Sequence, residues 1–142
     1  MLTYVSSSPR MTMDIATKLS KDFRGGEIVA LKGDLGMGKT CFVKGLAIGL
    51  GFNGEVTSPT FAIVNEYIGG RLDLFHFDMY RITGWDDLYS TGYFEYTPQG
   101  GVVAVEWSEN IEGALGDDVI TVVFERISDN ERKITISGGD AE

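Results

Sequence analysis

One short stretch of the sequence has the residue types and spacing that bind phosphate. Residues 33–40 read GDLGMGKT and match the pattern of a glycine-rich phosphate-binding loop, G-x-x-x-x-G-K-[ST]. Backbone N–H groups of such a loop can surround phosphate oxygens, because glycines tolerate the dihedral angles that this requires. We expect Lys39 to reach the outer phosphates and the Thr40 hydroxyl to coordinate Mg²⁺. The predicted nucleotide-binding residues here are Gly33, Asp34, Leu35, Gly36, Met37, Gly38, Lys39, Thr40 and Cys41.

Two acidic residues are candidates for the chemistry on a bound triphosphate. Glu106 follows the apolar run 102–105, and Asp78 follows residues 74–77 in the same manner. Both should project from the carboxyl ends of strands, where ligands bind in open α/β sheets. We predict that Asp78 binds the metal and that Glu106 either binds it or orients the attacking water, with Lys39 completing the catalytic set. Two carboxylates beside a triphosphate repel it unless a divalent cation lies between them, which favours Mg²⁺.

Other chemically distinctive residues have structural interpretations. His76 is the single histidine, and a lone histidine more often satisfies a local hydrogen bond than catalyses a reaction. Trp85 and Trp107 are interpreted as core or interface anchors. Cys41 is the single cysteine, so it forms no internal disulfide, and we expect it to be a small buried hydrophobic residue.

The phosphate-binding motif lies between a predicted strand, residues 27–32, and a predicted helix, residues 40–50. A strand, a loop and a helix in this order present the helix N-terminus to the same anion. The continuous apolar run 101–107 predicts a central strand that is buried on both faces. Ser108 is predicted to cap a short helix toward Leu115. This helix and the helix at 40–50 can supply the crossovers that parallel strands require.

The remaining segments predict antiparallel additions to this sheet. Ser8-Pro9 reads as a helix start, and Gly25-Gly26 as the end of a helix that runs to about Arg24. Gly69-Gly70 and Asp129-Asn130 are predicted hairpin turns. The other predicted elements are a strand at 2–5, a strand at 61–67, a strand at 71–80, helical turns at 85–90, and strands at 119–126 and 132–137.

Length and composition limit the possible classes of protein. The chain has 142 residues, of which 43% are hydrophobic, and no linker-like segment divides it. We therefore predict one α/β phosphate-loop NTPase-like domain over residues 1–137, with a mixed sheet and helices on both faces, and a flexible tail over 138–142. With a formal charge of −9, the chain should not bind nucleic acid strongly by itself. Without an apolar run of about 18 residues or a signal-peptide pattern, the expected location is cytoplasmic, with no membrane association.

Four motifs, taken together, resemble the TsaE family of small bacterial ATPases. They are GDLGMGKT at 33–40, TSPTF at 57–61, HFDMYR at 76–81 and EW at 106–107, and the resemblance covers about residues 7–135. It implies an ATPase that binds ATP and Mg²⁺ and is weak in isolation. It also implies a role in making threonylcarbamoyladenosine next to the tRNA anticodon, with TsaD and TsaB type proteins as partners.

The resemblance implies roles for particular residues. Lys39 corresponds to the phosphate lysine and Thr40 to a Mg²⁺ ligand, while Asp78 and Glu106 correspond to the acids at the metal and the attacking water. Thr60 resembles a switch residue that senses the γ-phosphate. Thr12 and Arg132 are implied to hold the base or the phosphates.

Three alternatives share the phosphate-binding motif. A small-molecule kinase usually has an acceptor pocket and an arginine-bearing lid, and the six arginines here are scattered without a lid-like insertion. A guanine-nucleotide switch usually has an N-K-x-D base-reading motif, which this sequence lacks. The third alternative is a module that binds a nucleotide without hydrolysing it, and the sequence does not exclude it.

Overall fold

A seven-stranded sheet organises the part of the chain that the computed structural model describes, which comprises residues 2–33, 38–52, 64–79, 82–108, 115 and 118–138. Its elements in chain order are β1 (Leu2–Ser6), α1 (Pro9–Ser20), β2 (Ile28–Lys32), α2 (Lys39–Gly49), β3 (Val64–Tyr67), β4 (Leu74–Asp78), α3 (Trp85–Ser90), α4 (Tyr93–Tyr96), the 3-10 helix η1 (Thr97–Gln99), β5 (Val102–Glu106), β6 (Ile120–Arg126) and β7 (Arg132–Ser137).

The sheet is mixed, with a parallel centre and antiparallel edges. Its strand order is β1-β7-β6-β2-β5-β4-β3. β2 pairs in parallel with β5 and β6, and β5 pairs in parallel with β4. β3, β7 and β1 add antiparallel pairs at the two sides. All five residues of β5 are buried, as its apolar run predicts.

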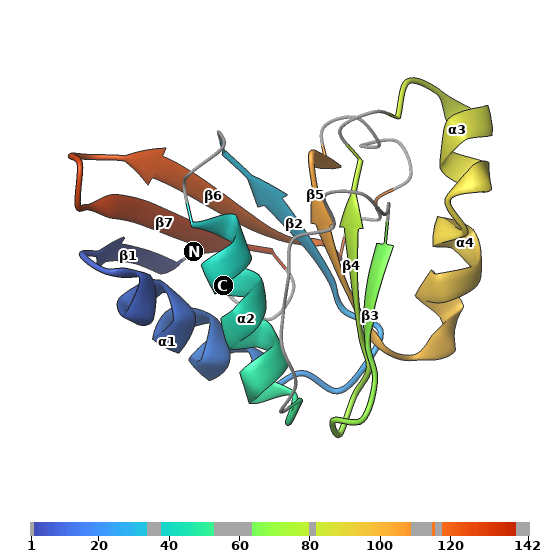
Figure 1. The fold of residues 1–142 in the computed structure, drawn as a ribbon, viewed down its shortest axis with the longest axis horizontal. Helices are drawn as coiled ribbons and strands as arrows, with labels where there is room; N and C mark the ends of the chain where they lie inside the picture. Colours follow the sequence, from blue (N-terminus) through green and yellow to red (C-terminus); the bar gives the residue numbers. More distant parts are fainter. Residues whose placement is uncertain are drawn as a thin grey trace.

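Helices cover both faces of the sheet (Figure 1). Alternate residues of β5 point to opposite faces, so Val102 and Ala104 join a core with α1 and α2, whereas Val103 and Val105 join a core with α3 and α4. Figure 1 shows α1 and α2 over the β7, β6 and β2 side, and α3 and α4 on the β4 side. The predicted α/β class, with a mixed sheet and helices on both faces, is confirmed.

α1 ends four residues earlier than the sequence predicts, at Ser20 instead of about Arg24. The cause is a distant side chain, because the Arg71 guanidinium donates hydrogen bonds of 2.7–2.9 Å to the carbonyl oxygens of Ser20, Lys21 and Phe23. These bonds satisfy carbonyls that a longer helix would have paired internally. Arg71 was predicted to begin a strand, but β4 begins only at Leu74.

The crossovers also differ from the prediction. The parallel strands β4 and β5 are joined through α3, α4 and η1, of which the sequence indicated only the turns at 85–90. α2 leads instead to β3, the antiparallel strand at the sheet edge. The predicted helix from Ser108 toward Leu115 has most of its length, residues 109–114, outside the described residues.

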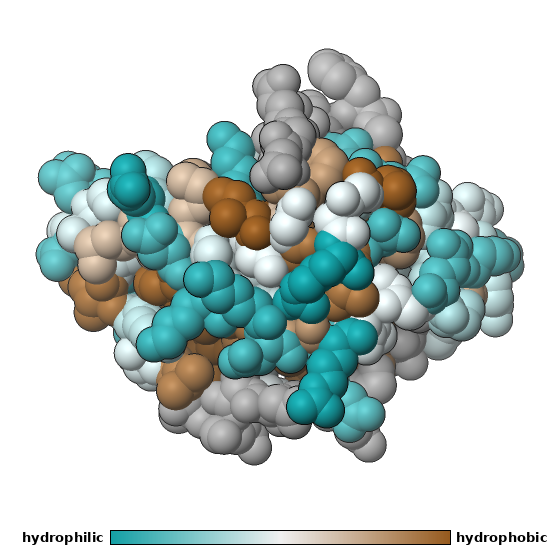
Figure 2. Space-filling view, turned by 90° about the horizontal axis from the view of Figure 1, so that it is seen from below, coloured by the Kyte–Doolittle hydropathy of each residue, from teal (hydrophilic) through white to brown (hydrophobic). Residues whose placement is uncertain are grey.

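No described helix is both long and apolar enough to cross a membrane. Seen from below, apolar side chains form separate brown areas among hydrophilic ones, not one continuous apolar surface (Figure 2). β7 ends at Ser137, while residues 139–142 lie outside the described residues, so the predicted tail stays a prediction.

Two glycines allow α1 and α2 to approach each other closely. A Cβ atom added at Gly45 would lie 2.1 Å from the Met13 carbonyl oxygen, and one at Gly49 would lie 1.8 Å from the Ser20 Oγ atom. Such distances are impossible without movement of the helices. This contact sets the position of α2, and therefore the position of its first residues next to the sheet.

We predict that Gly45→Ala lowers the free energy of unfolding by about 1–3 kcal/mol, because the added methyl group forces the two helices apart. Helix propensity alone predicts the opposite sign, a gain of about 1 kcal/mol for alanine. Urea denaturation measures the difference. Lys44→Ala, at an exposed position of the same helix, is the control and should change stability by no more than about 0.5 kcal/mol. A more stable Gly45→Ala variant would contradict the close contact.

A second prediction concerns the buried Tyr93 hydroxyl, which has no hydrogen-bond partner among the described residues. Burial raises the pKa of Tyr93 from 10.0 to about 12. The protonated form is therefore favoured in the folded state. Its stabilising effect is complete below pH 10 and is lost as the pH rises through 12, by up to about 2–3 kcal/mol.

Tyr93→Phe keeps the ring contact with Phe77 and removes the ionisable group. We expect this variant to lose less stability than the wild type between pH 10 and 12, as measured by denaturant unfolding at each pH. If the free energy of unfolding of the two proteins changes equally with pH, the raised pKa of Tyr93 is contradicted.

Candidate nucleotide-binding site

The two described ends of the phosphate-binding motif have backbone conformations suited to glycine. Gly33 has φ +146° and Gly38 has φ +94°, in a region that other residues rarely adopt. Gly38 is also the residue from which α2 starts, and its carbonyl oxygen accepts the Phe42 N–H at 3.0 Å. The chain thus passes from β2 into a helix N-terminus that can face an anion. Asp34, Leu35, Gly36 and Met37 lie outside the described residues.

Lys39 is buried at the first position of α2, with only 5% of the residue exposed. Its Nζ atom donates a 2.8 Å hydrogen bond to the Gly33 carbonyl oxygen and lies 3.9 Å from Glu106 Oε1. The Nζ atom also lies 5.1 Å from the centre of the Trp107 ring. A buried ammonium group requires such partners. They hold the positive charge between the ends of the phosphate-binding motif and the end of β5.

The two predicted acids are neighbours on adjacent strands. Asp78 pairs with Glu106 in the parallel register of β4 and β5, so the two residues point to the same face of the sheet. This is the face that α2 covers. Glu106 is 8% exposed, and its Oε2 atom lies 2.6 Å from His76 Nε2. The structure therefore brings Lys39, Glu106 and Asp78 to one edge of the sheet, as the sequence predicts.

His76 has a larger part in this arrangement than the sequence indicated. It is fully buried two residues before Asp78, and it makes the short hydrogen bond to Glu106. Its Nδ1 atom is buried without a partner among the described residues. An unpaired buried N–H costs more than an unpaired lone pair, so the proton belongs on Nε2, where it is donated to the Glu106 carboxylate.

The donor atoms are compatible with Mg²⁺. This ion uses oxygen ligands and is usually held by one or two carboxylates, with water and substrate phosphates filling the other positions. Asp78 and Glu106 supply carboxylates, and Thr40 lies in the first turn of α2. The described residues contain no group of three or more His, Cys, Asp or Glu that could hold a metal by itself.

A cavity of about 280 Å³ adjoins the start of α2 and contains four of the predicted nucleotide-binding residues, which are Thr12, Gly38, Cys41 and Arg132. It lies where the β1–α1 connection, the start of α2 and the β6–β7 turn meet. Its other lining residues are Ser6, Ser7, Ser8, Pro9, Asp129 and Asn130. Cys41 is partly exposed here, so the expectation that it is a buried core residue is wrong.

Thr12 and Arg132 already have partners within the protein. The buried Thr12 hydroxyl lies 2.7 Å from Ser6 Oγ, and the Arg132 guanidinium donates to the Ser128 carbonyl oxygen at 2.8 Å. These bonds fix both side chains at the wall of the cavity. No sequence pattern indicated the contribution of Asp129 and Asn130, because a hairpin turn carries no information about the helix that it will face.

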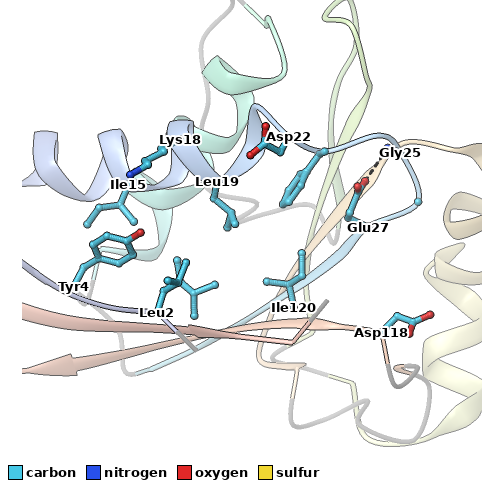
Figure 3. Close-up of a pocket in the computed structure, with 13 residues that line it drawn as sticks. Leu2, Tyr4, Ile15, Lys18, Leu19, Asp22, Gly25, Glu27, Asp118 and Ile120 are labelled. Carbon is cyan, nitrogen blue, oxygen red and sulfur yellow. Dashed lines mark hydrogen bonds between the residues drawn. The ribbon is translucent and has the colours of Figure 1, made fainter. Parts of the chain in front are cut away.

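A larger cavity, of about 540 Å³, lies at the other edge of the sheet (Figure 3). Ile15 and Leu19 of α1 face Leu2, Tyr4 and Ile120 across it, and charged residues such as Asp22, Glu27 and Asp118 stand at its border. This cavity adjoins the amino ends of β2 and β6. It contains none of the predicted site residues, and α/β sheets bind ligands at the opposite edge. Thr60, the remaining predicted site residue, lies outside the described residues.

We predict from this geometry that the His76 ring carries its proton on Nε2. Because His76 is the single histidine, its two ring nitrogens can be assigned directly by nitrogen-detected NMR. His76→Ala should lower the free energy of unfolding by about 1–3 kcal/mol, since it leaves a buried carboxylate with one partner fewer. His76→Gln, which keeps an N–H donor, should lose less. A proton found on Nδ1 would contradict the hydrogen bond to Glu106.

Comparisons with known proteins identify the family. A family model described as "Threonylcarbamoyl adenosine biosynthesis protein TsaE" matches residues 6–134. The chain is 39% identical to the TsaE protein of Treponema pallidum, over 94% of this chain and 98% of that protein. It is 40% identical to the TsaE protein of Bacillus subtilis, over 96% and 85% of the two chains. The crystal structure of Bacillus subtilis YdiB is similar, with a TM-score of 0.78 and 38% identity over 96% of this chain and 84% of that one. With nearly the whole of its length matched in sequence and in fold, the chain belongs to the TsaE family of tRNA threonylcarbamoyladenosine biosynthesis proteins.

Proposed function

We propose that this protein is a phosphate-loop ATPase that binds Mg-ATP and supports threonylcarbamoyladenosine modification of tRNA by partner-stimulated hydrolysis. The observation that carries the proposal is the contact between the buried ammonium of Lys39 and the carboxylate of Glu106, at the end of the phosphate-binding motif. A base or metal ligand and a phosphate-binding cation are thereby held within one small volume. Hydrolysis of a phosphoanhydride needs both.

The residues divide the work of hydrolysis as follows. Lys39 would exchange its hydrogen bond to the Gly33 carbonyl for the outer phosphates and stabilise negative charge there. Glu106 accepts a hydrogen bond from the attacking water, and His76 keeps the Glu106 carboxylate in place. Asp78 and Thr40 would hold Mg²⁺. The ion, when bound, neutralises charge on the phosphates.

The 280 Å³ cavity is the proposed place for the remainder of the nucleotide. Gly38, which belongs to the phosphate-binding motif, and Cys41, which directly follows it, line this cavity. Thr12 and Arg132 line it as well. Its volume is near the lower limit for small-ligand pockets, which suits part of a nucleotide better than a whole one.

The proposed partners are TsaD and TsaB type proteins, which would hold the tRNA. A chain with a net charge of −9 is repelled by phosphodiester backbones, so it is better suited to act on an RNA-binding partner than on RNA itself. The proposed location is the cytoplasm, and the single cysteine of the chain is compatible with a reducing compartment.

A module that binds ATP without hydrolysing it is the alternative that the same site could serve. The two functions differ in what Glu106 does. A binding module needs Lys39 and the loop, but it does not require a carboxylate that a buried histidine holds beside the lysine.

We predict that Glu106→Gln binds Mg-ATP within about three-fold of the wild-type affinity and loses at least about 100-fold in turnover, because the amide cannot accept a proton from water. Calorimetric titration measures the affinity, and phosphate release measures the turnover, both for the chain alone and with the TsaD–TsaB pair. The wild-type turnover should be slow alone and rise with the pair.

Asp14→Asn, an exposed acid on α1, is the matched control and should behave as the wild type. If Asp78→Ala and Glu106→Ala both support full tRNA modification, the hydrolytic mechanism is wrong and the non-hydrolysing module is favoured. If the TsaD–TsaB pair has no effect on wild-type turnover, the partner assignment fails.

A further inference from the structure

Three aromatic side chains form a patch on α3 and α4, on the side of the molecule opposite β1 (Figure 1). We call Trp85, Tyr89 and Phe94 the aromatic patch. Trp85 is 55% exposed and Tyr89 is 61% exposed, which is unusual for side chains of this size. Trp85 stacks on Phe94 with an interplanar angle of 15°, and the rings of Tyr89 and Phe94 lie 4.9 Å apart.

Contacts within the protein support the aromatic patch. Phe94 packs against the core between the sheet and α3–α4, which anchors the patch from below. Trp85 and Tyr89 are four residues apart on α3, so they lie on one side of the helix. The start of α3 is held by Thr83, whose hydroxyl donates a 2.8 Å hydrogen bond to Asp87 Oδ2. Little conformational entropy remains to be lost at such a surface.

The two helices that carry the aromatic patch have acidic side chains and no lysine or arginine. Residues 82–125 contain nine acidic side chains and no lysine or arginine, while the rest of the chain has twelve of each sign. The whole net charge of −9 therefore comes from this segment. Asp86, Asp87 and Glu95 are exposed on the same two helices as the aromatic patch.

This charge discriminates between possible occupants. A nucleic acid could stack its bases on exposed aromatic rings, but its phosphates need lysine and arginine nearby. A second copy of this chain would place acidic residues against acidic residues in a symmetric contact. A protein surface with lysine and arginine around an apolar pocket is complementary to both the acidic charge and the exposed aromatic rings. Tryptophan and tyrosine are also the residues that most often dominate binding energy in protein interfaces.

The aromatic patch lies on the opposite face of the sheet from the candidate site. α3 and α4 pack on Phe77 and Val105, which immediately precede Asp78 and Glu106 in β4 and β5. Tyr93, next to Phe94 in sequence, makes an edge contact with the Phe77 ring. A partner bound to α3 and α4 therefore contacts elements that support the two acidic residues from the other face of the sheet.

We propose that the aromatic patch is the docking surface for a protein partner that offers an apolar pocket rimmed by lysine and arginine. The inference rests on the proposed function in one respect, which is that the partner is sought in the TsaD–TsaB pair. It adds the surface used and the chemistry of the opposing face.

The test uses the full-length chain and the purified cognate TsaD–TsaB pair. Trp85→Ala and Tyr89→Ala should each weaken binding to the pair by about ten- to one-hundred-fold in calorimetric titration. Asp86→Lys should weaken binding to the pair more at low salt than at high salt, because the substitution reverses a charge at the border of the aromatic patch. All three variants should keep the wild-type unfolding midpoint and the wild-type phosphate release without the pair. Ile48→Ala and Ile127→Ala, two exposed apolar positions elsewhere, are the matched controls and should bind normally.

The outcomes separate this inference from the proposed function. Normal binding by Trp85→Ala and Tyr89→Ala overturns the docking surface and leaves the ATPase untouched. Failure of the wild-type chain to bind the pair overturns both the partner assignment and the docking surface, while phosphate release by the chain alone still tests the ATPase separately. Binding of single-stranded RNA that is lost in Trp85→Ala would identify the aromatic patch as a base-stacking surface and overturn the inference.

Discussion

The buried carboxylate of Glu106 is the constraint around which the site is built. A carboxylate at the end of a central strand loses most of its hydration, so it must be compensated by partners of suitable charge and geometry. His76 supplies a hydrogen bond of 2.6 Å from the neighbouring strand, and Lys39 supplies a positive charge at 3.9 Å from the start of α2. The register of β4 against β5 and the position of α2 must therefore be correct together.

The position of α2 depends in turn on its contact with α1. Gly45 and Gly49 bring the two helices close enough that a methyl group at either position would collide with α1. The same approach puts Thr12 of α1 beside Gly38, where the smaller cavity begins. The close packing of α1 against α2 thus determines the position of the Lys39 ammonium group and of one wall of the adjoining cavity.

The sheet separates two surfaces that have different chemistry. Glu106, Asp78 and His76 lie on the face of the sheet that α2 covers. The smaller cavity lies at the carboxyl ends of the strands. The other face is covered by α3 and α4, which carry exposed aromatic rings among acidic residues. Because side chains alternate along β4 and β5, every residue of these strands that faces the site is adjacent to one that faces α3 and α4.

The sequence by itself determined the phosphate-binding motif, the buried strand that ends in Glu106 and the α/β class, because these depend on local residue patterns. Glycine spacing sets backbone conformation, and a continuous apolar run requires burial on both faces. Only the tertiary structure decided that Arg71 ends α1 near Ser20, that α3 and α4 connect β4 to β5, and that His76 bonds to Glu106. The two hydrogen-bonded contacts join residues 30 and 51 positions apart in the chain. Their formation depends on strand order and helix packing, which no local pattern encodes.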